Sequence, residues 1–105
     1  MNSLLNNYSI QVNYPDVSGA EQLEMLTIRD QIFQIEKLLN SQEKQILSHS
    51  DQQLIANANQ IYTELSQFID LIHYREIQKI RAEQWWWYLD VITKLPRLQL
   101  TTQNS

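Results

Sequence analysis

An aspartate, a histidine and a glutamate follow one another at helical spacing in the second half of this sequence. Asp70 and His73 are three residues apart, and Glu76 comes three residues later. On a helix this spacing puts the side chains on one face, as in half of a carboxylate–histidine metal site in a helix bundle. The other histidine, His49, has no acid three or four residues away. We therefore expect no metal site in a monomer, and only a two-fold axis would complete one.

The sequence lacks the residues that nucleophilic or cofactor chemistry requires. Its 105 residues include no cysteine and one glycine, so it offers neither a thiolate nor a glycine-rich phosphate loop. It also has no G-x-S-x-G motif, and its acids are spread along the chain. We expect no enzymatic activity and no cofactor. The lack of cysteine fits a reducing compartment, and we predict a cytoplasmic protein.

A run of consecutive aromatic residues is the most informative feature. At 100° per residue, residues 85–88 would occupy nearly the whole circumference of a helix. A helix that is apolar on two sides is buried on two sides, and Trp and Tyr commonly anchor protein interfaces. The alternatives are a place in the core of the chain or at headgroup depth on a membrane. We predict a partner interface made by Trp85, Trp86, Trp87, Tyr88, Leu89 and Ile92.

The charge is divided unevenly along the chain. The formal net charge is −4, with −6 on residues 1–71 and +2 on residues 72–105. A basic, aromatic end can contact nucleic acid through phosphates and base stacking. However, Lys79 and Glu83 have the spacing of a helix-surface ion pair, and +2 is a weak footprint, so nucleic-acid binding is the alternative function. Its cations would be Arg75, Lys79, Arg81 and Arg97.

The elements that position these residues are predicted to be long helices. One glycine and two prolines are too few for the turns of a sandwich, a barrel or a doubly wound sheet. Ser18 and Glu21 have the spacing of a capping box, and the apolar seam that follows predicts a helix from 19 to about 40. A second such box, at Ser50 and Gln53, predicts the start of the next helix.

This second helix is expected to be longer than the first. Residues 51–94 would extend about 66 Å and residues 19–47 only about 43 Å. Either the longer helix bends near residues 70–74 to give a three-helix bundle, or a second chain covers the overhang of a helical hairpin. Because residues 68–74 contain no Gly, Pro or Asn, we favour a homodimer or another homo-oligomer.

Strict apolar–polar alternation over residues 8–14 predicts a short strand. Its partner would be the weakly alternating residues 97–101 or another chain, unless it lies as a strap across the helices. The residues expected on its apolar face are Tyr8, Ile10, Val12 and Tyr14.

These patterns predict an all-α fold in three parts: an extended segment at 1–17, a helical domain at 18–95, and a partly disordered extension at 96–105. We expect neither a signal peptide nor a membrane span. The predicted function is a small non-catalytic protein–protein interaction module (an adaptor, assembly factor or regulatory subunit) that self-associates through its long aromatic helix. A nucleic-acid-associated regulator and a peripheral membrane-surface protein are the alternatives.

Overall fold

The computed structural model describes residues 2–95, and its regular structure there is entirely helical. This confirms the all-α prediction. No strand occurs within residues 2–95, so the predicted strand at 8–14 is wrong. The α-helices are α1 (Ser3–Gln11), α2 (Gly19–Ile35), α3 (Ser41–Ala56), α4 (Ala58–Ser66), α5 (Leu71–Gln78) and α6 (Leu89–Ile92), with 3-10 turns η1 (Glu36–Leu38) and η2 (Trp85–Trp87).

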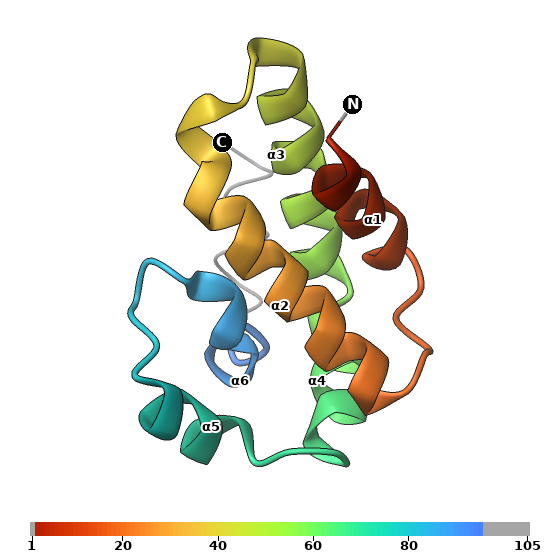
Figure 1. Cartoon of the computed structure of the whole chain (residues 1–105). Helices are drawn as coiled ribbons and strands as arrows, with labels where there is room; N and C mark the ends of the chain where they lie inside the picture. Colours follow the sequence, from red (N-terminus) through yellow and green to blue (C-terminus); the bar gives the residue numbers. More distant parts are fainter. Residues whose placement is uncertain (1, 96–105) are drawn as a thin grey trace.

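Helix α2 and the successive helices α3 and α4 form the two arms of a hairpin that turns at η1 (Figure 1). The Ser18 side chain accepts a hydrogen bond from the Glu21 amide at 3.3 Å, so α2 begins at the predicted residue. Asn40 and Glu43 form a reciprocal capping box that starts α3 at Ser41. Ser50, which we expected to cap a helix, is instead buried inside α3.

The N-terminal segment is a packed helix and not the predicted extended strand. The Asn2 side chain caps α1 by accepting from the Leu4 amide at 2.8 Å. A helix pairs its own backbone groups, whereas a lone strand leaves them without a ladder. Leu5, Tyr8 and Val12 are buried at helical spacing, whereas Ile10 and Tyr14 are 50% and 57% exposed.

The unbroken helix over residues 51–94, which was the alternative that we favoured, is also wrong, because the chain breaks three times without glycine or proline. Asn57 separates α3 from α4, and its side-chain amide donates to the Val12 carbonyl at 2.8 Å. Asp70 caps α5 by accepting from the His73 amide, and Lys79 ends α5 with a positive φ of 54°. The chain therefore folds back, and the apolar overhang that favoured a second chain does not arise within residues 2–95.

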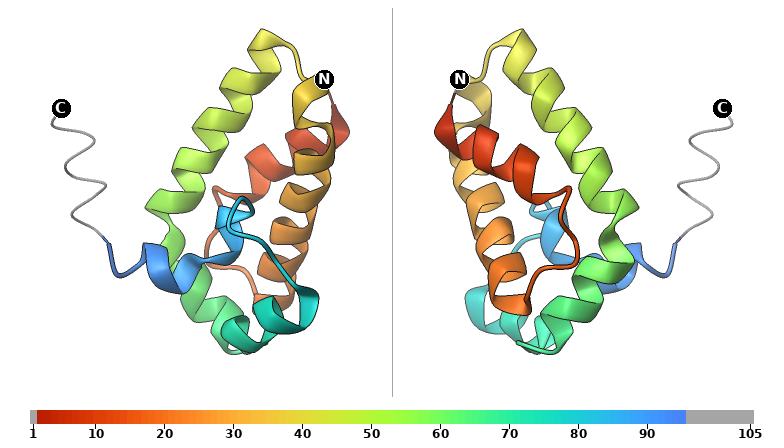
Figure 2. Two further views of the ribbon diagram at one scale, coloured as in Figure 1. Left: turned by 90° about the vertical axis from the view of Figure 1, so that its left-hand side faces the viewer. Right: turned by 90° about the vertical axis from the view of Figure 1, so that its right-hand side faces the viewer.

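Two segments cover opposite sides of the hairpin and complete one core (Figure 2). Helix α1 packs on α2 and α3, while η2 contacts α2 and α6 contacts α4. At the base of the hairpin Gly19 lies so close to α4 that an added Cβ would be 2.5 Å from the Glu64 carbonyl oxygen. The large side chains that the core buries completely include Leu5, Tyr8, Met25, Leu26, Ile32, Leu54, Ile61, Leu65, Trp86, Trp87 and Leu89.

The predicted C-terminal extension at 96–105, including Arg97 and the possible strand at 97–101, lies outside the described residues. In the described part of the chain, no helix has the length and apolar character needed to cross a bilayer.

Candidate interaction cleft

The predicted aromatic interface is divided between the core and the surface. Trp86 and Trp87 are each 1% exposed, and Leu89 is completely buried. Trp85, Tyr88 and Ile92 pack against the core but remain partly exposed. Because Trp85–Trp87 form a 3-10 turn and not part of a long helix, the side chains do not surround one helix axis as predicted. Only the partly exposed members can contact a partner without unfolding the core.

A single carboxylate oxygen holds the two buried indoles. Oδ1 of Asp30, on α2, accepts the indole N–H groups of Trp86 and Trp87 at 2.8 Å each. The Gln84 side chain donates to the same oxygen at 3.1 Å. Buried indole N–H groups need such partners, and bonds to a carboxylate are stronger than neutral ones. Asp30 therefore fixes η2 against α2.

This arrangement presents Trp85 to an open cleft between the C-terminal part of α2 and α3. The Trp85 ring packs edge-on against Trp86, with 5.7 Å between centroids. The cleft has a volume of about 600 Å³. We call it the basic cleft; its lining includes Lys37, Lys44, Leu47, Gln52, Ile55 and Trp85, together with Arg29, Glu36 and Asp51.

An ion pair in the wall of the basic cleft and a hydrogen bond to it join three helices. Arg29 is 3% exposed, and its Nε and Nη2 donate to the two carboxylate oxygens of Asp51 at 3.0 and 3.1 Å. The Tyr8 hydroxyl donates to Asp51 Oδ1 at 2.6 Å. Burial, followed by the charge of Asp51, raises the pKa of Tyr8 far above its usual range. Although burial alone would lower the pKa of Arg29, its bond to Asp51 and the Asp51 charge raise it, so Arg29 stays charged.

The remaining guanidinium nitrogen is less well satisfied. Nη1 of Arg29 lies 3.2 Å from Oε1 of Glu36, but the geometry of this ion pair is not that of a hydrogen bond. Among the described residues, neither buried atom has a hydrogen-bond partner. The Glu36 side chain is 42% exposed, although the Oε1 atom that faces Arg29 is buried. Arg29 therefore retains one donor for a better-placed acceptor.

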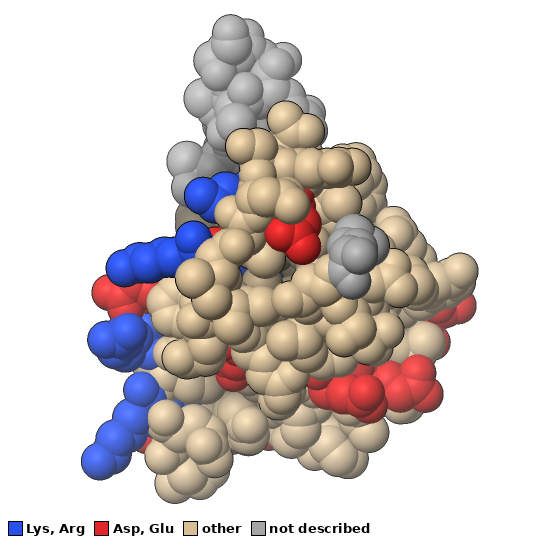
Figure 3. Space-filling model, turned by 45° about the horizontal axis from the view of Figure 1, so that its top comes forward, with Lys and Arg blue, Asp and Glu red and all other residues tan. Residues whose placement is uncertain are grey.

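The basic cleft gathers the scarce positive charge of an acidic region. Residues 1–71 contain three cations, and all three, Arg29, Lys37 and Lys44, line this one cleft. In Figure 3, Lys and Arg side chains follow the left-hand edge of the face shown, whereas the largest group of acidic side chains lies at the lower right. Glu36 and Asp51, which pair with Arg29, line the same cleft, so the two lysines supply its excess positive charge, which attracts anionic groups.

Two of the four cations of the predicted nucleic-acid surface, Arg75 and Arg81, form ion pairs within the chain, whereas Lys79 forms none within residues 2–95. Arg75 forms a bidentate ion pair with Asp90 and donates to the Trp87 carbonyl at 3.0 Å. Its guanidinium also lies 4.4 Å from the centroid of the Tyr88 ring. Arg81 is paired with Glu83, although both are exposed. Although burial alone would raise the pKa of Asp90, its bonds from Arg75 and the Arg75 charge hold it below its ordinary value.

The spacing of Asp70 and His73, which suggested half of a metal site, is that of a helix cap. The Asp70 side chain caps α5 through the His73 backbone amide, at 3.2 Å, while the His73 side chain is exposed. Residues 2–95 contain no group of three acid, histidine or cysteine side chains that could hold a metal ion.

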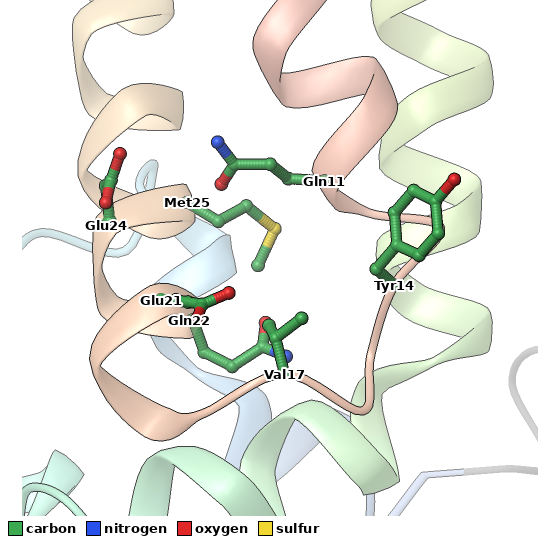
Figure 4. Close-up of a pocket in the computed structure, with 7 residues that line it drawn as sticks. All are labelled: Gln11, Tyr14, Val17, Glu21, Gln22, Glu24 and Met25. Carbon is green, nitrogen blue, oxygen red and sulfur yellow. The ribbon is translucent and has the colours of Figure 1, made fainter.

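A smaller pocket lies between the end of α1 and the start of α2 (Figure 4). Its volume is about 340 Å³, and its lining includes Tyr14, Gln22 and Met25. The buried Gln22 amide is already used, because it donates to the Pro15 carbonyl at 3.1 Å and so holds the α1–α2 loop. This pocket is thus smaller than the basic cleft, and its buried amide is already bonded within the chain.

Comparison with protein-family models, with curated proteins and with solved structures found no match to this chain. Of the predicted interface, the basic cleft includes Trp85 alone. Sequence reasoning missed Arg29, Lys37 and Lys44, although one signal pointed to the first of them. Arg29 lies four residues after Met25 and three before Ile32, in the apolar stripe of α2. A lone cation in such a stripe indicates a buried ion pair.

Proposed function

We propose that this chain is a small, non-catalytic protein-interaction module, an adaptor, assembly factor or regulatory subunit of the cytoplasm, which binds a segment of its partner in the basic cleft. The cysteine-free composition supports the cytoplasmic assignment. The absence of a nucleophile motif or glycine-rich loop supports a non-catalytic role.

One observation carries the proposal: a partly exposed tryptophan is held rigidly at the wall of an open cleft. Trp85 packs against Trp86, which is itself fixed by Asp30 on α2. Tryptophan is enriched among the side chains that contribute most to binding energy, and rigid positioning reduces the entropy lost on association. Ile55 adds apolar surface to the same cleft, and Gln52 adds hydrogen-bonding groups.

Selection from a random peptide library displayed on phage tests this proposal. We expect peptides that bind the wild-type protein and lose binding to the Trp85→Ala variant. The control is Ile77→Ala, which removes an exposed apolar side chain outside the cleft lining and should leave binding unchanged. Failure to enrich any peptide, or equal binding to Trp85→Ala, would contradict the proposal.

Self-association is the second candidate, and a different surface supports it. The turn after α4 and the first turn of α5 expose Phe68 and Ile72, at 54% and 50%. Where exposed apolar side chains adjoin on a surface, they often mark contacts between chains. If this surface joins two copies, light scattering will give the mass of a dimer for the wild type and of one chain for Phe68→Ser/Ile72→Ser. If the wild-type protein has the mass of one chain even at high concentration, self-association is excluded.

A further inference from the structure

We propose that the occupant of the basic cleft is an acidic peptide segment that also carries apolar side chains. This inference rests on the proposed function and adds the chemical class of the partner. In this proposal Lys37, Lys44 and Arg29 attract carboxylates of the peptide and not phosphates of a nucleic acid.

The placement of charge supports an anionic partner. Lys37 and Lys44 are exposed, come from η1 and α3 respectively, and both line the cleft. Neither lysine forms an ion pair within residues 2–95. Exposed cations that are not paired within the chain increase the association rate with an acidic segment by electrostatic steering.

The rest of the lining favours a peptide over a nucleic acid. Leu47, Ile55 and Trp85 give apolar surface that suits the side chains of Leu, Met or Phe between acidic residues. Glu36 and Asp51 lie in the same cleft, and the whole chain carries a net charge of −4. Such a field repels a continuous polyanion, whereas a peptide brings only a few carboxylates, which its apolar side chains can position beside the lysines.

Arg29 supplies a deeper contact. Its Nη1 faces Glu36 without a hydrogen bond, and the Glu36 side chain is partly exposed. A carboxylate of the bound peptide takes the place of the Glu36 carboxylate and accepts from Nη1, while the bidentate bond to Asp51 is kept. Glu36 thus competes with the carboxylate of the peptide for Arg29, and replacing Glu36 should increase the affinity for the peptide.

Titration of one phage-selected peptide into the wild type and three variants tests this inference by calorimetry. We expect the selected sequences to be enriched in Asp and Glu next to apolar residues. Lys37→Glu/Lys44→Glu should weaken binding by about tenfold or more. Arg81→Glu/Lys94→Glu makes the same change in net charge at exposed cations outside the cleft lining, and should weaken it far less. Glu36→Gln should bind several-fold more tightly, a gain that misfolding cannot produce.

The outcomes separate this inference from the proposed function. Selected peptides that require Trp85 but lack acidic residues, or that bind both double variants equally, would overturn the acidic-peptide inference and leave the interaction module standing. Displacement of the peptide by random-sequence single-stranded DNA at physiological salt would also overturn it, in favour of a nucleic-acid site. A selection that yields no binding peptide would overturn both.

Discussion

Trp86 and Trp87 are adjacent in the chain, yet their indole N–H groups converge on the same carboxylate oxygen, Oδ1 of Asp30, at 2.8 Å each. The tight 3-10 turn at Trp85–Trp87 makes this convergence possible. Both rings are buried, and the turn is held against α2. The same anchor leaves Trp85 at the surface, where it lines the basic cleft.

Replacing Asp30 with alanine should destabilise the fold. The change leaves two buried indole N–H groups without their acceptor, and we expect the free energy of unfolding to fall by about 2–4 kcal/mol. Asp30→Asn keeps a neutral acceptor and should cost less. Urea denaturation followed by circular dichroism measures both losses. An unchanged midpoint for Asp30→Ala would show that this oxygen does not hold the turn.

Two adjacent tryptophans should respond differently to truncation. Trp86→Ala opens a cavity in the core and should cost about 3–5 kcal/mol of stability. Trp85→Ala removes a partly exposed ring, so we expect a smaller stability loss together with loss of peptide binding. Denaturation curves and the phage-selected peptide provide the two measurements. Equal stability losses would mean that Trp85 is a core residue and not a binding residue.

Gly19 should tolerate no side chain despite its position in a helix. An added Cβ would lie 2.5 Å from the Glu64 carbonyl oxygen and 2.6 Å from Phe68 Cβ, so α2 and α4 would have to separate. Such overpacking costs about 1–3 kcal/mol, against a gain in helix propensity of about 1 kcal/mol. We therefore expect Gly19→Ala to lower the melting temperature. A higher melting temperature would show that the two helices are not in close contact.

The Arg75–Asp90 pair should make stability depend on pH in acid. The folded pKa of Asp90 is below its unfolded value of 3.8, so the pair contributes fully above that value. Its contribution is lost as the pH falls from 3.8 through the folded pKa. Asp90→Asn should therefore be less stable than the wild type near neutral pH, with the difference shrinking in acid. Urea denaturation at several pH values tests this, and a constant difference would contradict it.

The sequence was a good guide where local chemistry decides the structure. The Ser18–Glu21 cap placed the start of α2 correctly, because this signal lies within one helix turn of the residues that it orders. Scarcity of glycine and proline correctly excluded β folds.

The sequence was a poor guide where distant contacts decide it. The alternation at residues 8–14 also contains the helical pair Tyr8 and Val12, and only packing on α2 and α3 selects the helix. The break at Asn57 depends on a bond to Val12, 45 residues away. The hydrogen bonds from Trp86 and Trp87 to Asp30 connect residues that are 56 and 57 positions apart in the chain. The basic cleft likewise brings together residues of α2, α3 and η2. No spacing within one helix could reveal these contacts.

Site-specific photo-crosslinking tests the central claim most directly. A benzophenone amino acid is placed at Gln52, an exposed residue of the basic cleft, or at Gln60, an exposed residue of α4 outside the cleft lining, in cells that make the protein. We predict a defined partner cross-linked from position 52 and absent from position 60, with the cross-link mapped to an acidic segment. Cross-links of equal pattern from both positions, or none from position 52, would contradict an interaction module that binds through the basic cleft.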